Sequence, residues 1–451
     1  MVARIAARLR GAPSPFCLGL WLALSLGGCG GGGGGGSSSS SSSSASKSAA
    51  STASSLSPTA ALGKRIFADT ALSANGQQAC VSCHVPSNAF SPTDGRSTQL
   101  GGPNLDLPGL RSSPTLTYVS FTPAFHYSDG TAFGGFFRDG RSPSLANQAT
   151  QPFVTSFEMA NPDAQAVLTK LVTRPYKNQF AAIFGAEALR DANTALTDIG
   201  LAIAAYETEA PEFHLFNSKF DAFQNGHATL TAAETAGFAL FLNPTKGNCA
   251  ACHIPTPVNG VPALFTDFSF DNVGIPRNWA IEANSATSTL PYAPSDGVAL
   301  GTPNYRYYDM GICGPLRTDV GVTSLCGMFK VPSLRNSALR QHYFHNGVFG
   351  NLNDVVTWYA TRDTDPKRWY VQADGVTPDI PYNDLPQLYD ANINVVEVPY
   401  NPALAPTLNA TEINELVTFL CTLTDGYDPA SPASYPYPAQ CQAAANAALS
   451  Q

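Results

Sequence analysis

The chain contains two pentapeptides of the form Cys-x-x-Cys-His, at residues 80–84 and 249–253. In such a motif the two thiols form thioether bonds with a porphyrin, and the following histidine reaches the iron. The pattern therefore predicts two covalently bound c-type haems. A zinc site built from both Cys-x-x-Cys turns is the alternative, but it leaves each histidine without a role. The predicted haem-binding residues are Cys80, Cys83, His84, Cys249, Cys252 and His253.

The N-terminal residues carry targeting signals rather than a folded domain. Residues 1–28 combine three arginines, a short apolar run and small residues, which predicts an export signal. The Leu-Gly-Gly-Cys ending resembles a lipobox, so we expect a lipoprotein signal peptide cleaved before Cys29 and lipid attached to its thiol. An ordinary cleaved signal is the alternative. Residues 29–57 are rich in Gly and Ser and predict a flexible linker. We expect a periplasmic chain held at the membrane by its lipid anchor only.

Composition narrows the class of protein further. About 390 residues follow the linker, which is enough for two domains of ordinary size. The formal net charge of −8 argues against nucleic acid as a partner. In an exported chain, the remaining close cysteine pairs predict the disulfides Cys313–Cys326 and Cys421–Cys441. Free structural thiols are the alternative.

Short motifs recur in the same order along the chain and indicate a duplicated unit. Pro-Thr-Leu at 114–116 and Phe-Arg-Asp-Gly at 137–140 follow the first pentapeptide. Pro-Ser-Leu at 332–334 and Phe-His-Asn-Gly at 344–347 follow the second. The same order twice favours two related haem domains over one.

Apolar residues at helical spacing occur on both sides of the expected domain boundary. They are Val167, Leu168 and Leu171 after Asn161-Pro162; Leu196, Ile199 and Ile203; Phe238, Phe241 and Leu242 behind a Thr231/Glu234 capping box; and Ile413, Leu416, Val417 and Leu420. We expect a mainly α fold of two cytochrome c-like haem domains with long loops. The first half is residues 58–215, and the second half is residues 216–451.

The most specific stretches are Phe-Arg-Asp-Gly-Arg at 137–141, Phe-Lys-Val-Pro-Ser-Leu-Arg-Asn at 329–336 and Tyr-Phe-His-Asn-Gly at 343–347, together with Gln148 and Glu158. With these stretches and both pentapeptides, residues 62–427 resemble the bacterial di-haem cytochrome c peroxidases and their MauG-type relatives.

The resemblance implies that the first haem is the peroxidatic site. His84 would be its proximal ligand, with Gln148 and Glu158 on the distal side where hydrogen peroxide binds. Cleaving the peroxide bond requires one proton to be removed and one to be delivered, which a carboxylate can do. Glu158 is therefore the expected acid–base group, and Gln148 would orient the peroxide.

The coordination of the first haem is expected to be open. Some relatives carry a blocking histidine shortly after the first motif, but residues 98–102 contain none. We therefore predict a first haem that needs no reductive activation. His126 is expected to pack or hydrogen-bond in a loop.

The second haem would store and pass electrons, with His253 as its proximal ligand. The register of the resemblance places Tyr359 where the peroxidases have methionine and the MauG-type enzymes have tyrosine. Tyr359 is thus the predicted sixth ligand. Met310, Met328 and His342 are alternatives, and Tyr359 as a plain core residue is another.

Two further positions depart from the family pattern. Arg138 stands where relatives usually have a tryptophan between the haems, and we expect it to pair with a haem propionate. The resemblance also implies Ca²⁺ between the domains. Ser112 stands in register with the asparagine ligand, and the other contacts would be carbonyls near Arg340 and His342. Binding and loss of calcium both stay open at this stage.

The leading hypothesis is a peroxide-dependent di-haem oxidoreductase that reduces hydrogen peroxide with electrons from a small cytochrome c or cupredoxin. A MauG-like oxidase acting on a protein or organic substrate is one alternative, which Tyr359 favours. A non-catalytic di-haem electron carrier is the other, and a homodimer is left open.

Overall fold

The computed structural model describes residues 55–285, 290, 307–400, 405–435 and 437–449. The described residues from Ser55 onward belong to one compact unit. The predicted signal peptide, Cys29 and nearly all of the predicted linker lie outside the described residues. Among the described helices, none is long and apolar enough to cross a membrane.

The prediction of a mainly α chain with long loops is confirmed, and the strands are short and form antiparallel pairs. The helices are α2 (Pro58–Phe67), α3 (Cys80–Cys83), α4 (Leu145–Val154), α5 (Ala164–Leu171), α6 (Lys177–Phe184), α7 (Ala192–Glu209), α8 (Lys219–Gln224), α9 (Ala232–Leu242), α10 (Leu352–Thr361), α11 (Pro366–Trp369), α12 (Ala410–Cys421) and α13 (Ala439–Leu449). The strands are β1 (Leu100–Gly101), β2 (Leu107–Pro108), β3 (His126–Ser128), β4 (Thr131–Phe133), β5 (Phe270–Asp271) and β6 (Phe329–Lys330).

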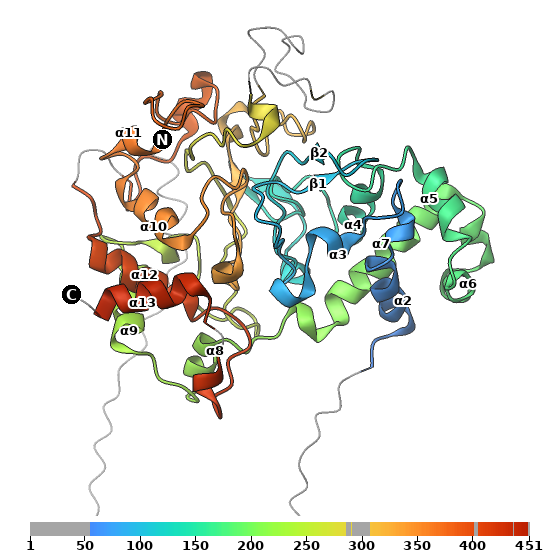
Figure 1. The fold of residues 1–451 in the computed structure, drawn as a ribbon, viewed down its shortest axis with the longest axis horizontal. Helices are drawn as coiled ribbons and strands as arrows, with labels where there is room; N and C mark the ends of the chain where they lie inside the picture. The colour runs from blue at the N-terminus through green and yellow to red at the C-terminus, as the bar shows by residue number, and fades with distance from the viewer. Residues whose placement is uncertain (1–54, 286–289, 291–306, 401–404, 436, 450–451) are drawn as a thin grey trace, which may run out of the picture. The chain divides into compact units, whose positions relative to one another are not determined.

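In the first half, α2, α4 and α5 pack around α7 (Figure 1). The predicted apolar positions of α5 and α7 are largely buried. However, α5 begins later than its Asn161-Pro162 signal suggested, with Asp163 as N-cap. The side-chain amide of Asn161 instead donates to the carbonyls of Leu72 (2.9 Å) and Phe153 (2.8 Å). Asn161 therefore ties the end of α4 to an earlier loop rather than starting a helix.

In the second half, α9, α10 and α13 pack around α12. The predicted capping box is confirmed, because the Thr231 hydroxyl accepts from the Glu234 amide and the Glu234 carboxylate accepts from the Thr231 amide. All four predicted apolar positions of α12 are buried. They join an aromatic core that includes Phe220, Phe265 and Phe419.

The two halves repeat the same close helix crossing. A Cβ on Gly63 of α2 would lie 1.8 Å from the Ala202 carbonyl oxygen of α7, and a Cβ on Gly237 of α9 would lie 2.0 Å from the Glu415 carbonyl oxygen of α12. Only glycine allows backbones to approach this closely. The crossings α2/α7 and α9/α12 therefore correspond, which agrees with a duplicated unit. The boundary near residue 215 stays a prediction.

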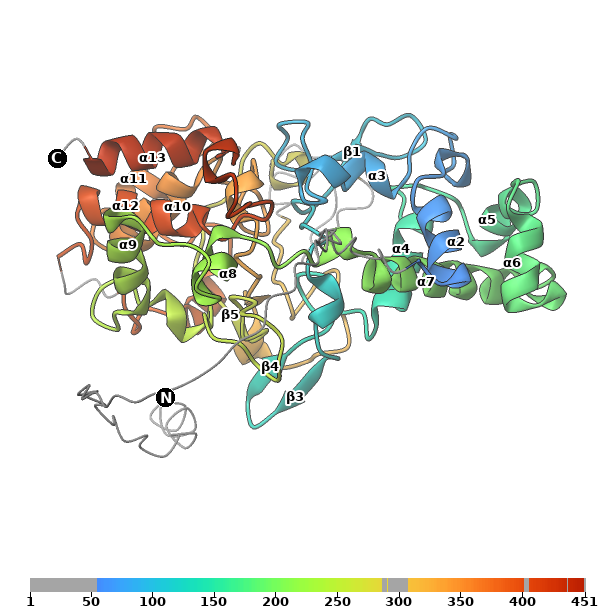
Figure 2. The same cartoon turned by 90° about the horizontal axis from the view of Figure 1, so that it is seen from below.

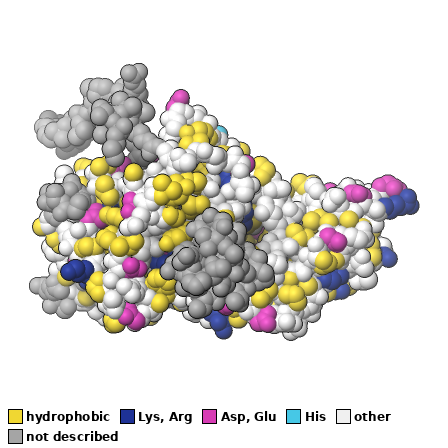
Figure 3. Space-filling model, turned by 90° about the horizontal axis from the view of Figure 1, so that it is seen from above, with side chains coloured by type: hydrophobic (Ala, Val, Ile, Leu, Met, Phe, Trp, Pro, Cys, Tyr) yellow, Lys and Arg dark blue, Asp and Glu magenta, His cyan; other side chains and the backbone are white. Residues whose placement is uncertain are grey.

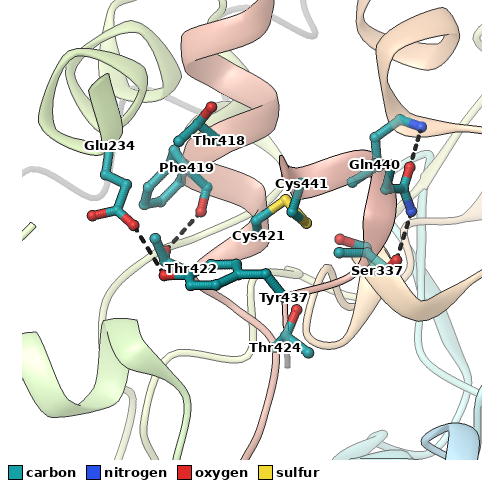
Figure 4. The surroundings of a disulfide bond; sticks show 12 residues. Glu234, Ser337, Thr418, Phe419, Cys421, Thr422, Thr424, Tyr437, Gln440 and Cys441 are labelled. Atoms are coloured by element: carbon teal, nitrogen blue, oxygen red, sulfur yellow. Dashed lines mark hydrogen bonds between the residues drawn. A yellow bond between two sulfur atoms is a disulfide. The ribbon is translucent and has the colours of Figure 1, made fainter. Parts of the chain in front are cut away.

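Both predicted disulfides are confirmed, Cys313–Cys326 and Cys421–Cys441. Figure 4 shows the second, which joins the end of α12 to α13. The β3–β4 hairpin projects from the helices in Figure 2. His126 lies in this hairpin and stacks on Phe133 with ring centroids 5.2 Å apart, as expected for a packing role.

We expect the Gly237→Ala variant to lose about 3 kcal/mol of unfolding free energy, because its methyl group forces α9 away from α12. Thr235→Ala, at an exposed position of the same helix, is the matched control and should change stability by less than about 0.5 kcal/mol. Denaturant unfolding of the haem-loaded proteins measures both. Equal midpoints for the two variants would contradict the close crossing.

Candidate functional site

Each pentapeptide lines one of two cavities of similar size. The first cavity has a volume of about 290 Å³ and is lined by residues of α3, α4 and α7. The second has a volume of about 280 Å³ and is lined by residues of α10 and α12. The predicted residues Cys80, Cys83 and His84 line the first, and Cys249, Cys252 and His253 line the second.

The two motif histidines are held in the same way. The Nδ1 atom of His84 lies 3.1 Å from the Phe90 carbonyl oxygen, and that of His253 lies 2.9 Å from the Phe265 carbonyl oxygen. With the proton on Nδ1 donated to a carbonyl, Nε2 keeps its lone pair for a metal. Burial lowers the pKa of His84 to about 4, so its ring is neutral at pH 7.

The two phenylalanines that supply these carbonyls have left-handed backbones. Phe90 has a φ of 52° and Phe265 has a φ of 55°. A bulky residue in this region carries strain of about 1–3 kcal/mol, which the surrounding packing must hold. Both side chains are buried. Phe90 stacks on Phe213 at 4.0 Å, and Phe265 packs on Phe220 at 5.2 Å.

The four motif cysteines form no disulfide. Burial raises the pKa of Cys83 and of Cys249 to about 12, which keeps both as thiols. Two thiols and one neutral imidazole beside an apolar cavity are the donors that a c-type haem requires. The residues present therefore fit a haem in each cavity.

The first cavity brings the two predicted distal residues together. Gln148 of α4 and Glu158 of the following loop both line it. The Glu158 amide donates to the Thr155 carbonyl at 3.0 Å, which fixes the loop just after α4. Burial raises the pKa of Glu158 to about 7, although Arg141 and Thr155 act in the opposite direction. A carboxyl group with this pKa can both accept and donate a proton near neutral pH.

A second carboxyl group of the first cavity was missed by sequence reasoning. Glu207 of α7 lines the cavity and is only 2% exposed. Its Oε2 atom has no hydrogen-bond partner among the residues that the structure describes, and burial raises its pKa to about 8. The available signal was a glutamate four residues after Ile203, on the apolar face of the helix.

In the second cavity, Tyr359 of α10 lies on the wall, as does Tyr400. Their rings stack with centroids 5.8 Å apart. Met310, Met328 and His342 are not among the lining residues in the described chain. The ring nitrogens of His342 instead face the carbonyls of Gly95 and Gly347.

The cavities share a wall that contains Arg138 and Lys330. The Nε atom of Arg138 donates to the Ser112 carbonyl at 3.0 Å. Burial, followed by repulsion from Arg340, lowers the pKa of Arg138. The arrangement is suited to an anionic partner such as a haem propionate.

Comparison with known proteins agrees with this geometry. Residues 57–229 match the family model described as di-haem cytochrome c peroxidase. The methylamine utilization protein MauG of Paracoccus denitrificans is 38% identical over 309 residues, which cover 66% of this chain and 73% of that protein. Cytochrome-c peroxidase IdrP2 of Denitromonas iodatirespirans is 29% identical over 311 residues, covering 66% and 72%.

Among solved structures, the diheme peroxidase BthA from Burkholderia thailandensis matches with a TM-score of 0.71 and 36% identity, covering 82% of this chain and 87% of that one. Fold and cavities together thus define an oxidoreductase with two c-type haems. The chain belongs to the di-haem cytochrome c peroxidase family.

We expect the Cys80→Ala/Cys83→Ala variant to carry one haem, because only the second cavity keeps its thiols. Cys249→Ala/Cys252→Ala should also carry one. Cys313→Ser/Cys326→Ser removes cysteines that line neither cavity and should keep both haems. The pyridine haemochrome assay counts them, and two haems in either alanine variant would contradict the assignment.

Proposed function

We propose that this chain reduces hydrogen peroxide to water at the first cavity, with two electrons supplied by a small cytochrome c or cupredoxin. The observation that carries the proposal is the position of the Glu158 carboxyl group. It lines the same cavity as His84 and the motif thiols, and its pKa of about 7 suits proton transfer. An electron carrier without catalysis has no use for such a group beside its haem.

The chain's own residues would handle the protons. A haem bound at His84 supplies the redox chemistry at iron. The Glu158 carboxylate accepts a proton from the peroxide oxygen that lies nearer to the haem. It then donates this proton to the other peroxide oxygen, which leaves as water. Gln148, which lines the same cavity, orients the peroxide by hydrogen bonding. A further pair of protons from solvent completes the reduction, so that one peroxide and two electrons give two waters.

Oxidation of a protein side chain or an organic substrate is the second candidate. Tyr359 on the wall of the second cavity favours it, since a phenolate ligand stabilises oxidised iron more than a thioether does. The relative of 38% identity is a MauG protein. In this role the peroxide chemistry stays at the first cavity, and only the source of the electrons changes.

Tyr127 and Trp358 are aromatic side chains that can relay electrons, but neither lies on the wall that the two cavities share. Tyr127 lies in the projecting hairpin and is 42% exposed. Trp358 is buried in the second core and lines neither cavity. We propose that electrons pass directly across the wall that the two cavities share, which contains Arg138 and Lys330. Arg138 would pair with a haem propionate there.

We also propose an exported chain, anchored in the periplasm through lipid on Cys29. Two confirmed disulfides support an oxidising compartment. On the face shown in Figure 3, Lys and Arg side chains are scattered singly among acidic and apolar ones, which suits a small redox protein better than nucleic acid. A homodimer stays a prediction.

We expect Glu158→Gln to slow the reaction with peroxide by about 10². Since Glu158 must be deprotonated to accept the first proton, the native rate should fall about tenfold for each pH unit below its pKa of about 7. The variant should lose this dependence. Stopped-flow mixing with peroxide measures both, and Glu187→Gln, at an exposed position, is the control. An unchanged rate would remove Glu158 from the mechanism.

Tyr359→Phe should change the absorption spectrum of the second haem while the first stays as it is, because only the phenol oxygen can bind iron. Tyr127→Phe, in the exposed hairpin, should change neither. Spectra of the oxidised proteins test the ligand, and an unaltered spectrum would leave Tyr359 as a core residue.

A further inference from the structure

Arg340 joins segments that lie far apart in the sequence. It follows the turn η9 (Ser337–Leu339) in the second half. Its Nη2 atom donates to the hydroxyl of Ser112 at 3.2 Å and to the carbonyl of Ser113 at 3.1 Å, both in the first half. Its Nε atom donates to the carbonyl of His342 at 3.1 Å. One guanidinium group therefore holds three oxygens from two segments.

Neighbouring backbone contacts show that this is a continuous junction. The Ser112 amide donates to the His345 carbonyl at 2.8 Å, and the Gly95 amide donates to the Gln341 side chain at 2.9 Å. Arg340 lies in the middle of this junction and also lines the second cavity.

The three oxygens that face the guanidinium are all neutral. An arginine guanidinium group stays protonated in proteins. Arg340 therefore remains a cation at pH 7. A buried positive charge surrounded by a hydroxyl and carbonyl oxygens is the arrangement of a cation site, with the cation supplied by the chain itself.

Two of these three oxygens, on Ser112 and His342, are ones that the family resemblance assigns to calcium. The Ser112 hydroxyl and the His342 carbonyl bind the Arg340 guanidinium. The Arg340 carbonyl accepts from the Tyr343 hydroxyl at 3.1 Å. Calcium needs six to eight oxygens at about 2.3–2.6 Å. Two arginines, Arg340 and Arg138, would also repel it at this place. The residues present do not fit calcium.

We propose that the guanidinium of Arg340 replaces a calcium ion at the junction between the two halves, so that their association does not depend on a divalent metal. Arg340 is a positioning residue that holds Ser112 and Ser113 against His342. The proposal is independent of the peroxidase function.

The first experiment uses the full haem-loaded protein, dialysed without chelator. Elemental analysis should find no stoichiometric calcium, and neither EGTA nor calcium chloride should move the Tm. One calcium per chain, removed by EGTA with a fall in Tm, would overturn the proposal without a variant.

The second experiment replaces the cation. Arg340→Ala should lower the Tm by about 3 °C, and millimolar calcium chloride should restore part of this loss, because the three oxygens are then free. Arg340→Lys keeps the charge and should lose less, with no response to calcium. Arg190→Ala, whose side chain is 74% exposed, is the control and should match the native protein. An unchanged Tm for Arg340→Ala, or a loss that calcium does not reduce, would contradict the cation role.

Discussion

The structure depends on the hydrogen bond between each motif histidine and one backbone carbonyl. His84 and His253 meet the carbonyls of Phe90 and Phe265, residues with left-handed backbones and deeply packed side chains. The aromatic core holds the strained backbone of each phenylalanine, and with it the carbonyl group, in place. The carbonyl fixes the plane of the imidazole ring and keeps the proton on Nδ1, which sets the direction of Nε2. The cores of the two halves are therefore part of the haem sites.

The electrostatics of the two cavities follow from burial. Away from bulk water, the neutral form of a carboxyl group is favoured, which raises the pKa of Glu158 to about 7 and of Glu207 to about 8. The same effect lowers the pKa of Lys330 to about 8 on the shared wall. Glu158 and Glu207 line the first cavity, whereas Arg138 and Lys330 lie on the wall that the two cavities share.

At Arg340, a side-chain cation holds the two halves together at the place where the family resemblance implies a calcium ion. Ser112 offers one hydroxyl where an asparagine ligand was expected, and the guanidinium fork meets the freed oxygens. Because this cation is part of the chain, the junction needs no external metal ion, and a chelator cannot remove it. The adjacent Arg138 extends the positive wall toward both cavities.

Local patterns were enough to predict both haem motifs, the disulfides, the Thr231/Glu234 capping box and the buried face of α12. Each of these depends on residues close in sequence, where spacing alone determines which atoms meet. Other features depend on contacts between distant segments, whose geometry no local pattern encodes. Asn161 looked like a helix start until its bonds to Leu72 and Phe153 were visible. Glu207 became a site residue only when α7 closed the first cavity. Tertiary structure alone brought Arg340 to Ser112, 228 residues away, because burial there requires each oxygen to find a donor.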